Sequence, residues 1–569
     1  MQRRVCAARG PALYFARVRG CRFPMASNLF GTLERARFIF RDSLDDVRAL
    51  VRAKVDPRDL VGSISDALRV PRAALHMLPR EVKTGPALER AARVSELPQL
   101  VSWPKDGGAF VTLPEVYTED PDAPGWRRSN LGMYRVQLSG GAYEPDVEVG
   151  MHYQIHRGIG VHQSKARRRG ERLRASVWVG GPPATVLAAV MPLPEGMPEV
   201  AFAGALNRRA LRLVRDEHGV AHADADFCVR GWVDPVATKP EGPFGDHLGY
   251  YSLVHDFPVL RVTSVTHRAD AVWPFTVVGR PPQEDSTFGA LIHEMVAPLV
   301  PDTFPGVSAL HAVDAAGVHP LLLAVGSERY TPWAERRRPA EVLTQAFALL
   351  GTGQTSLAKY LFIAAREDDP PDPHDVGAFL RHVLERVDPE RDWHFLPNTA
   401  QDTLDYSGSG LNEGSKVIVA GVGPKRRDLG ASVPADLALP DGFDDARVAL
   451  PGVLCVRGAK DAPLERLCAS QRAGGPLAPF PLVVVVDDAA FAARSLDDVL
   501  WIAFTRSDPA RDVRGVDETF AHKAWGCRGS VIVDARLKPH HAPPLEEDPE
   551  VERRVDRLFR RGGPLARWG

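Results

Sequence analysis

The middle of the chain, from about residue 96 to 282, is a series of short runs in which hydrophobic and polar positions alternate. Representative runs are "GMYRVQL" (132–138), "RASVWVG" (174–180) and "FPVLRVTSVTHR" (257–268), and glycines and prolines separate them. Because neighbouring side chains of a strand point to opposite faces, this alternation predicts a succession of strands. Many short strands in a row favour a β-barrel or a sandwich for this region.

Three segments predict helices. "SLDDVRALVRAKV" (43–55) begins with a serine, a residue type that caps helices. "PPATVLAAV" (182–190) has proline in its first turn, where the missing N–H costs little. "STFGALIHEMVAPLV" (286–300) follows a Pro-Pro turn, and Asp285 or Ser286 can cap it. We therefore expect a small α/β region before the strands and a helix after them.

The last third of the chain holds an internal repeat. Residues 318–392 are echoed by residues 450–512, and both copies end in Asp-Pro-x-Arg-Asp, at 388–392 and 508–512. Each copy has the pattern of buried strands and an amphipathic helix, which predicts an α/β unit that occurs twice. Two copies are too few for a solenoid, so duplicated packing or assembly domains are the better explanation. The segment 421–444 between them resembles a linker.

The length of the chain, 569 residues, exceeds what one hydrophobic core supports. The changes in pattern divide it into an N-terminal α/β region, a strand-rich domain, a linker helix and two α/β repeats. The predicted bounds are 1–95, 96–285, 286–306, 307–420 and 445–545. The predicted fold class is a mixture of α/β and β structure.

Composition excludes several classes of protein. Hydrophobic residues make up 44% and charged residues 25% of the chain, and the net charge is −1, which gives no reason to expect a nucleic-acid partner. We expect the one basic run, "KARRRGERLR" (165–174), to be a solvated hairpin or loop. No apolar run reaches the ~18 residues that cross a bilayer, and early arginines argue against a signal peptide. Six cysteines without a CxxC pair fit reduced thiols in a cytoplasm.

Four clusters of polar residues could carry chemistry. They are Asn130 with Arg135, His152 with His156, Glu195 with Glu199, and Glu241 with Asp246. Asn, His and Glu offer nitrogen and oxygen ligands that suit Mn²⁺ or Mg²⁺ near a phosphate. Arginine offers a forked partner to a carboxylate.

Placement on strands constrains these clusters. An offset of five puts Asn130 and Arg135 on opposite faces of one uninterrupted strand, so Asn130 must lie in the preceding loop or a bulge if both serve one site. His152 and His156 share a strand face, and Glu199 can open the helix that follows it. A structural explanation also exists, because strand histidines often pack in cores and acids beside Gly and Pro often mark turns. The residues alone indicate a mixed α/β enzyme with a candidate metal site.

Taken together and in this order, the four clusters resemble the UbiD family of reversible decarboxylases. The similarity extends to "GPALYF", "NLFGT", "VWVGGPPATVLAAVMPLPEG", "FPVLRVTSVTHRADAVWPFTVVGRPPQED" and "LDDVLWIAFTRSDPARD". It implies an N-terminal α/β region, a split β-barrel domain that binds prenylated FMN, a linker helix and a C-terminal assembly domain, duplicated here as in a longer branch of the family. Members usually carry further residues before "GPALYF", so we expect either a true start codon upstream or an incomplete N-terminal sheet with a bare edge.

The resemblance also implies roles for single residues. Mn²⁺, or Mg²⁺ in its place, would hold the cofactor phosphate and be bound by Asn130, His156 and Glu199. A potassium ion beside it would use backbone oxygens near Leu131, Ala188, Ala189 and Met191. Contacts to prenylated FMN fall at Met133, Tyr134, Arg135, His152, Tyr153, Gln154, Arg157 and Gly158. The catalytic network corresponds to Arg135, Glu241 and Asp246. Lys538 is a weaker candidate to touch cofactor or substrate, with a surface lysine as the alternative.

The chemistry of decarboxylation gives such a network a purpose. Loss of CO₂ from an aromatic or α,β-unsaturated acid leaves an sp² carbanion that no side chain can delocalise, so a cofactor must be the electron sink. One protein acid must then deliver a proton. We predict Glu241 as the ionised partner of Arg135 and Asp246 as the proton donor, with burial raising the pKa of Asp246. The Gly-Pro-Phe-Gly turn between the acids would fix their placement.

The resemblance also suggests a substrate and partners. Longer UbiD-type chains are associated with biosynthesis of menaquinone or ubiquinone, which suggests a polyprenyl-hydroxybenzoate or naphthoate-type acid. Smaller phenolic, heteroaromatic or cinnamic acids are the alternatives. A flavin prenyltransferase would supply the cofactor. We expect a cytoplasmic homo-oligomer that a lipophilic substrate draws towards membranes. Alternatives from other classes are a non-catalytic flavin-binding or assembly protein and a metal-dependent hydrolase.

Overall fold

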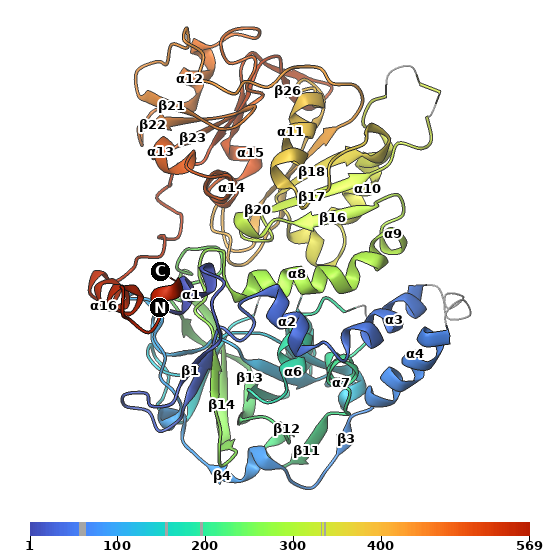
Figure 1. Ribbon diagram of the computed structural model, residues 1–569, viewed down its shortest axis with the longest axis vertical. Coiled ribbons are helices and arrows are strands. Elements are labelled where there is room, and N and C mark those ends of the chain that lie inside the picture. Colours follow the sequence, from blue (N-terminus) through green and yellow to red (C-terminus); the bar gives the residue numbers. More distant parts are fainter. Residues whose placement is uncertain (56–63, 154–156, 194–196, 332, 335–336, 569) are drawn as a thin grey trace. The chain divides into compact units, whose positions relative to one another are not determined.

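The structure of the protein is a computed structural model, shown in Figure 1, that describes residues 1–55, 64–153, 157–193, 197–331, 333–334 and 337–568. The chain forms two compact units. The first comprises residues 1–298 and 543–569, and the second comprises residues 299–542.

A large antiparallel sheet lies at the centre of the first unit. Nine strands of the described residues take part, in the order β5-β8-β9-β14-β13-β10-β6-β7, with β4 paired to β14. Their bounds are β4 Arg90–Ala91, β5 Phe110–Val111, β6 Glu115–Glu119, β7 Ser129–Gly132, β8 Val136–Gln137, β9 Glu148–Met151, β10 Leu173–Val179, β13 Phe227–Glu241 and β14 His255–His267. This curled sheet confirms the barrel-like domain that the alternating pattern predicted.

The sheet is buried on both faces, and β10 shows how its sequence achieves this. Ala175 and Val177 point into one hydrophobic core, whereas Trp178 points into the other. Trp178 stacks on Tyr117 of β6 with ring centroids 4.9 Å apart. Burial of a large apolar side chain stabilises a fold by about 1.5–3 kcal/mol, so these strands are held from both sides.

Helices cover the face of the sheet that Trp178 occupies. Residues of α2, α3, α6, α7 and α8 share its core. The helices of this unit are α2 Leu33–Ile39, α3 Leu44–Val55, α4 Ile64–His76, α5 Gly158–Arg169, α6 Pro183–Ala188, α7 Glu199–Asn207 and α8 Glu284–Val296. The predicted helices at 43–55, 182–190 and 286–300 are therefore all present.

Two local predictions need correction. The basic run from residue 165 is not a loop, because residues 165–169 are the last turns of α5, whose buried positions are Ile159, His162 and Ala166. Helix α8 begins two residues before Ser286, and Gln283 is its N-cap. The Ser286 hydroxyl accepts a hydrogen bond from the Gln283 backbone N–H at 3.1 Å, so it closes the first turn from inside the helix.

Smaller elements complete the first unit. Strands β1, β2 and β15 form one three-stranded sheet and β12, β11 and β3 form another. Their bounds are β1 Leu13–Phe15, β2 Met25–Ser27, β15 Trp273–Phe275, β3 Arg80–Glu81, β11 Arg212–Asp216 and β12 Gly219–His222. Near the two ends of the chain, α1 (Gln2–Ala7) and α16 (Pro549–Phe559) share a small core that contains Val5, Val555 and Phe559.

The second unit contains the duplicated fold. The first repeat has strands β16 Ala309–Ala312, β17 Leu321–Gly326, β18 Tyr360–Ala365, β19 Trp393–Ala400 and β20 Glu413–Gly421, with helices α9 Val300–Thr303, α10 Glu341–Leu350 and α11 Val376–Arg386. The second repeat has strands β21 Phe443–Leu450, β22 Val453–Gly458, β23 Leu482–Val486, β24 Val513–Gly515 and β27 Val531–Asp534, with helices α12 Leu464–Ser470, α13 Ala489–Ala492, α14 Leu496–Thr505 and α15 Pro509–Asp512. A hairpin of β25 (Glu518–Ala521) and β26 (Ala524–Cys527) is added to it.

The two repeats have the same topology. The strand orders are β16-β17-β18-β20-β19 and β21-β22-β23-β27-β24, so in each sheet the last strand along the chain lies between the third and the fourth. In both sheets the three central strands are parallel and the two edge strands are antiparallel to their neighbours. This shared topology confirms the internal repeat.

The repeated Asp-Pro-x-Arg-Asp sequence forms the same turn in both copies. The Asp388 backbone N–H donates to the Asp392 carboxylate at 2.9 Å, and the Asp508 backbone N–H donates to the Asp512 carboxylate at 2.7 Å. Each turn leads directly into an antiparallel edge strand, β19 or β24. The motif is thus a structural element of the repeat.

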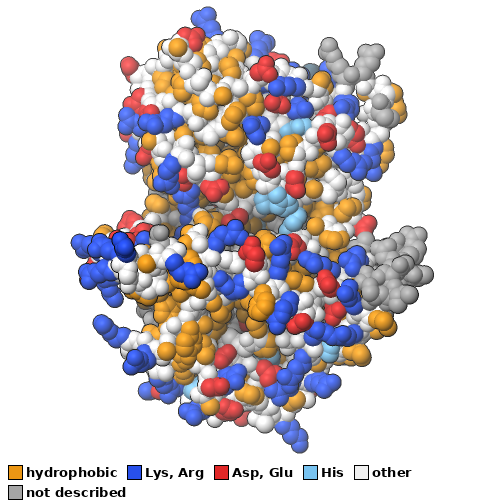
Figure 2. Space-filling model, in the orientation of Figure 1, with side chains coloured by type: hydrophobic (Ala, Val, Ile, Leu, Met, Phe, Trp, Pro, Cys, Tyr) orange, Lys and Arg blue, Asp and Glu red, His pale blue; other side chains and the backbone are white. Residues whose placement is uncertain are grey.

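The surface agrees with the composition. Figure 2 shows basic and acidic side chains interspersed on the visible face of each unit, as the net charge of −1 suggests. Within the described ranges, no helix has the length and apolar character needed to span a membrane.

Candidate active site

Three residues between β7 and β8 turn the chain between Asn130 and Arg135. Asn130 lies within β7, opposite Thr118, and Arg135 directly precedes β8. The expectation that Asn130 lies in a loop or bulge is wrong, because the irregular segment comes after it. Gly132 allows this turn, since a Cβ there would lie 2.1 Å from the Tyr134 ring that folds back over it. The Tyr134 hydroxyl donates to Asn130 Oδ1 at 3.1 Å.

Arg135 binds both predicted acids. Its Nε donates to Glu241 Oε1 at 2.8 Å and its Nη2 to Glu241 Oε2 at 2.6 Å, which makes a forked pair. Its Nη1 donates to Asp246 Oδ2 at 2.5 Å. Glu241 is fully buried, and the side chains of Arg135 and Asp246 are only 8% and 10% exposed. The three charges therefore interact in a largely water-free environment.

The turn between the two acids is held at several points. Glu241 ends β13, and the Gly242 backbone N–H donates to Gln137 Oε1 at 2.9 Å. Gly242 has a φ of +93°, a left-handed conformation that glycine adopts without strain. The Asp106 carboxylate accepts from the Gly245 backbone N–H at 2.8 Å. These bonds fix the position of Asp246 relative to Glu241.

The charge state of Asp246 differs from the prediction. Burial by itself would raise the pKa of Asp246, but the His247 ring hydrogen bond and the Arg135 charge outweigh it and hold the pKa well below its usual range. His247 donates its backbone N–H to Asp246 Oδ1 at 2.7 Å, and its ring Nδ1 lies 2.9 Å from the same oxygen. The prediction that burial raises the pKa of Asp246 is therefore wrong, and Asp246 is a carboxylate in this state.

The residues predicted to contact a cofactor lie around Asn130 and Arg135 where they are described. His152 directly follows β9, is 5% exposed and contacts the Phe257 ring with centroids 4.2 Å apart. Burial first, and the Arg135 charge second, lower the pKa of His152 well below its usual value. The Tyr153 and Tyr134 rings lie 6.2 Å apart.

Helix α5 begins beside Asn130. Arg157 is its N-cap and Gly158 its first residue. A Cβ on Gly158 would lie 2.3 Å from Asn130 Oδ1, so the helix can approach Asn130 only with glycine at this position. The predicted cofactor contact Gln154 and the third predicted metal ligand, His156, lie outside the described residues, as does Glu195.

Asn130 and Glu199 flank the same backbone segment. Glu199 is the first residue of α7, as predicted, and its Oε2 accepts from the Leu131 backbone N–H at 3.1 Å. Burial raises the pKa of Glu199 to about 7. The Asn130 side-chain amide nitrogen is buried and has no hydrogen-bond partner among the described residues. An amide and a buried carboxylate side by side fit a hard divalent cation, although the described residues contain no group of three acidic, His or Cys ligands.

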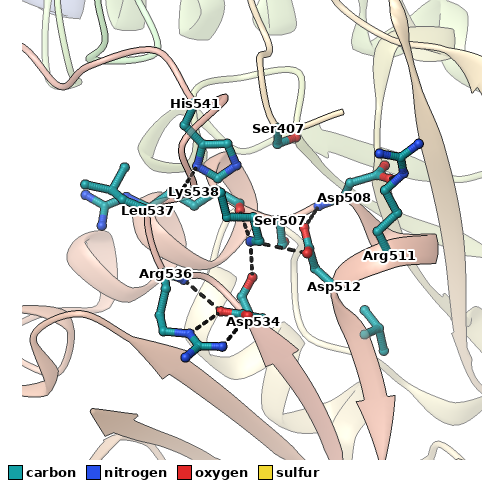
Figure 3. Close-up of polar contacts among 12 residues, drawn as sticks. Ser407, Ser507, Asp508, Arg511, Asp512, Asp534, Arg536, Leu537, Lys538 and His541 are labelled. Carbon is teal, nitrogen blue, oxygen red and sulfur yellow. Dashed lines mark hydrogen bonds and ion pairs between the residues drawn. The ribbon is translucent and has the colours of Figure 1, made fainter. Parts of the chain in front are cut away.

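Lys538 belongs to the second unit and is bound there. Its ammonium donates to the carbonyl oxygen of Asp534 at 3.0 Å and pairs with Asp512 at 3.3 Å, as Figure 3 shows. It also donates to the carbonyl oxygen of Arg506 at 3.2 Å. Its side chain is 18% exposed, so it is not a free surface lysine. These contacts join the end of β27 to the Asp-Pro-x-Arg-Asp turn of the second repeat.

Sequence reasoning missed two residues of the network. Ser252 accepts a hydrogen bond from Arg135 Nη2 at 2.9 Å and another from the Phe244 backbone N–H at 3.1 Å. His247 is the residue next to Asp246, and a histidine beside a candidate acid is the one signal that could have pointed to it. No pattern in the sequence indicates Ser252.

Three parts of the chain match the domains of a single family. Residues 1–54, 80–281 and 286–421 match the N-terminal, Rift-related and C-terminal domains described for 3-octaprenyl-4-hydroxybenzoate carboxy-lyase. The protein is therefore a carboxy-lyase, a decarboxylating enzyme. It belongs to the UbiD family, as the sequence resemblance predicted.

Relatives of similar length support this assignment. An uncharacterized protein of Chlamydia trachomatis serovar D is 37% identical over 571 residues, which cover 98% of this chain and 93% of the relative. A protein of Chlamydia pneumoniae, named as one subunit of a 4-hydroxybenzoate decarboxylase, is 37% identical over 574 residues, which cover 98% of this chain and 92% of the relative.

Solved structures share the fold at lower identity. The vanillic acid decarboxylase of Sedimentibacter hydroxybenzoicus in its closed form is 21% identical, with a TM-score of 0.60 over 77% of this chain and 90% of that one. The UbiD-class enzyme HmfF of Pelotomaculum thermopropionicum, in complex with FMN, is 23% identical, with a TM-score of 0.54 over 73% of this chain and 85% of that one.

Proposed function

We propose that this UbiD-family decarboxylase removes CO₂ from an aromatic or α,β-unsaturated carboxylic acid at the network of Arg135, Glu241 and Asp246. The observation that carries the proposal is Arg135, which binds two buried carboxylates at once. A purely structural ion pair needs one acid for one guanidinium. A second buried acid is costly unless it has a further use, such as the transfer of a proton.

The two acids would have different roles in the reaction. Glu241 is fully buried and uses both oxygens to hold the guanidinium, so its role is to hold Arg135 in place. Asp246 gives Arg135 a single bond and follows a glycine-rich turn, so it is the acid that can face a substrate carbon. In this proposal Arg135 also orients the substrate carboxylate, and Asp246 protonates the carbon after CO₂ has left.

We infer that prenylated FMN is the cofactor. When bound, it would supply the electron sink that decarboxylation at an sp² carbon requires. Support comes from HmfF, which is reported in complex with FMN and, in an evolved dimeric form, with prFMN. The residues that would hold it are Met133, Tyr134, Arg135, His152, Tyr153, Gln154, Arg157 and Gly158.

A divalent cation would join the cofactor phosphate to the protein. Asn130 and Glu199, with His156, would bind Mn²⁺ or Mg²⁺, and the position of the buried Glu199 carboxyl group on the backbone N–H of Leu131, next to Asn130, supports this. K⁺ would use backbone oxygens near Leu131, Ala188, Ala189 and Met191. One of these oxygens, that of Ala189, already accepts from the Met133 backbone N–H at 3.0 Å.

For the substrate we propose a 4-hydroxybenzoate-type acid in menaquinone or ubiquinone biosynthesis. The name of the Chlamydia pneumoniae relative supports a hydroxybenzoate. The names of structural neighbours that act on vanillic and 3,4-dihydroxybenzoic acid favour a small phenolic acid as the second candidate. A flavin prenyltransferase would supply the cofactor to a cytoplasmic homo-oligomer.

The test is turnover by protein coexpressed with a flavin prenyltransferase. Flavin absorbance and native mass spectrometry report cofactor, metal and the number of chains in the assembly, and CO₂ release is measured over a panel of prenylated and simple phenolic, heteroaromatic and cinnamic acids. We expect turnover of at least one acid only in flavin-loaded protein. Bound flavin without turnover of any acid would favour a non-catalytic flavin-binding or assembly protein, and activity without flavin would favour a metal-dependent hydrolase.

A further inference from the structure

His247 and Asp246 form a bonded pair at the edge of the network. The backbone N–H and the ring Nδ1 of His247 lie 2.7 Å and 2.9 Å from the same oxygen, Oδ1 of Asp246. The other oxygen, Oδ2, accepts from Arg135. One carboxylate oxygen thus has a permanently charged partner, whereas the other has an imidazole, a side-chain type that can carry protons.

The members of the network differ in their access to solvent. The Glu241 side chain is 0% exposed, that of Arg135 8% and that of Asp246 10%, whereas that of His247 is 18% exposed. His247 is the most exposed of the four. Its ring therefore connects the buried carboxylate to a position that water can reach.

The reaction requires a supply of protons. Conversion of R–COO⁻ to R–H and CO₂ consumes one proton in each turnover, and the proposed donor is Asp246. Because Arg135 and His247 hold Asp246 as a carboxylate, it must receive that proton before it can give it. A group that supplies it must lie within hydrogen-bond reach.

We propose that His247 supplies Asp246 with the proton that Asp246 gives to the substrate carbon, an inference that rests on the proposed function. The Nδ1–H bond of the protonated ring breaks and an O–H bond forms at Oδ1 of Asp246, which leaves a neutral ring. Asp246 then transfers this proton to the carbon that CO₂ has left. The neutral ring takes up a proton from water and returns to its first state. His247 acts through Asp246 and is thus a positioning residue.

Charged groups on the neighbouring elements set the balance of this transfer. Arg135, before β8, favours the carboxylate form of Asp246, and Glu241, at the end of β13, offsets part of that charge through its forked pair. Asp106 binds the backbone N–H of Gly245 and so holds the turn. The transfer from His247 is therefore uphill in the resting state and needs a substrate that competes for Arg135.

Two other histidines face the network. His152 follows β9, and His255 lies in β14 opposite Glu241. Burial is the largest cause that lowers the pKa of each, so both are neutral at pH 7 and have no proton to supply. Of the three rings, that of His247 is the one with a bond to Asp246 in the described contacts.

The cofactor-free protein tests the link between the two residues without turnover. The aspartate carboxyl groups are labelled with carbon-13 and observed by NMR. The resonance of Asp246 is identified as the one that is absent from the spectrum of Asp246→Asn. We expect His247→Leu to raise the pKa of Asp246, because the bond and the charge of His247 both lower it. The matched control is His218→Asn, since His218 also follows an acid, with its ring 3.8 Å from Glu217, but lies at the surface. An Asp246 titration that His247→Leu leaves unchanged would overturn the proposal.

The flavin-loaded enzyme tests proton supply. We expect His247→Asn, which keeps an N–H donor but cannot titrate, to lower kcat about 100-fold with little change in KM. The wild-type kcat should fall at high pH, where the His247 ring has no proton to give, and this fall should be absent in the variant. Added imidazole should restore turnover to His247→Ala. A His247→Asn variant with the kcat and the pH profile of the wild type would overturn the proposal.

Failure of the proposed function would look different. If loaded wild-type protein releases CO₂ from no acid, the proposed function fails, while the Asp246 titration in cofactor-free protein still reports the link to His247. If the wild type turns over and His247→Asn matches it, only the proton supply is wrong.

Discussion

At the scale of single residues, the charge states in the site depend on how the Arg135 guanidinium divides its hydrogen bonds between two acids. Glu241 takes two of the Arg135 bonds and Asp246 takes one, while His247 occupies the remaining oxygen of Asp246. Interactions between charges are strong where water is largely excluded. Small changes in these bonds should therefore alter charge states before they alter the fold.

Replacement of Asp246 by asparagine should abolish proton delivery. The Asp246→Asn side chain would keep the size of the original but carry no acidic proton, so we expect CO₂ release and solvent-deuterium incorporation into product to fall by about 10²–10⁴-fold. Mass spectrometry of the product in D₂O measures both. Asp270→Asn, which changes an exposed acid paired with Arg268, is the control and should retain wild-type rates. Unchanged deuterium incorporation in Asp246→Asn would remove Asp246 from the proposed role.

A second residue-scale prediction concerns pH and stability. Glu115 is fully buried opposite Trp178, and burial raises its pKa well above the usual value. The native state therefore holds a proton that the unfolded state releases, so this group's contribution to stability falls as pH rises from about 4.5 through its native pKa. Glutamine has no such proton to lose. We expect the difference in Tm, Glu115→Gln minus wild type, to increase as pH rises over that window, and calorimetry measures it. A difference in Tm that does not change with pH would contradict the prediction.

At the scale of elements, the alternating pattern predicted the strand-rich sheet because each strand buries side chains in one of two cores. It failed for α5, whose last turns are mostly Lys and Arg. Only Ile159, His162 and Ala166 are buried there, and Gly170, with φ +65°, ends the helix in a left-handed conformation. Three buried positions, one of them a histidine, are too few to reveal a helix against so many charges.

The start of α5 gives an element-scale prediction. Gly158→Ala would place a Cβ 2.3 Å from Asn130 Oδ1, whereas a Cβ on Gly160, two residues later in the same helix, would meet nothing within 4 Å. If Asn130 is a ligand of the proposed Mn²⁺, we expect Gly158→Ala to lose the metal on dialysis at least about tenfold faster than the wild type, because supporting contacts of this kind change metal affinity by about 10–100-fold. Gly160→Ala should behave as wild type. Metal analysis by mass spectrometry measures both, and equal retention in the two variants would count against Asn130 as a ligand.

The candidate site could be predicted in part. Because Arg135, Glu241 and Asp246 stand in motifs that resemble the family, their meeting was predictable, and the structure brings them together. The charge state of Asp246 was not, since it depends on the direction of one backbone N–H and one ring of His247. Ser252 was not predictable either, because a serine gives no signal of its partner.

At the scale of the whole chain, the second unit is a duplication whose two repeats are linked through a buried lysine. Lys359, which directly precedes β18 of the first repeat, is 1% exposed and pairs with Asp405 at 2.7 Å. Its ammonium also donates to the backbone oxygen of Ser507, in the second repeat, at 2.9 Å. The ion pair thus positions Lys359 within the first repeat, and the lysine links that repeat to the second.

Lys359→Met should weaken this unit. It would leave Asp405 buried without its cation, and loss of one partner of a buried pair costs about 3–5 kcal/mol. Urea unfolding measures the free energy of unfolding. Lys359→Met/Asp405→Leu should recover part of the loss, because it buries no unpaired charge. A single variant as stable as wild type would show that the pair does not hold the repeats.

The resting carboxylate of Asp246 has a consequence for the direction of the chemistry. A carboxylate beside an arene carbon is a base, and by microscopic reversibility the step that removes hydrogen from that carbon begins carboxylation. If Asp246 is the group that faces the substrate, the enzyme at rest has the protonation state that carboxylation of an arene requires. Before decarboxylation, Asp246 must first gain a proton. Exchange of ring hydrogen for deuterium in the decarboxylated product alone, without CO₂, would then be faster than the forward reaction at high pH.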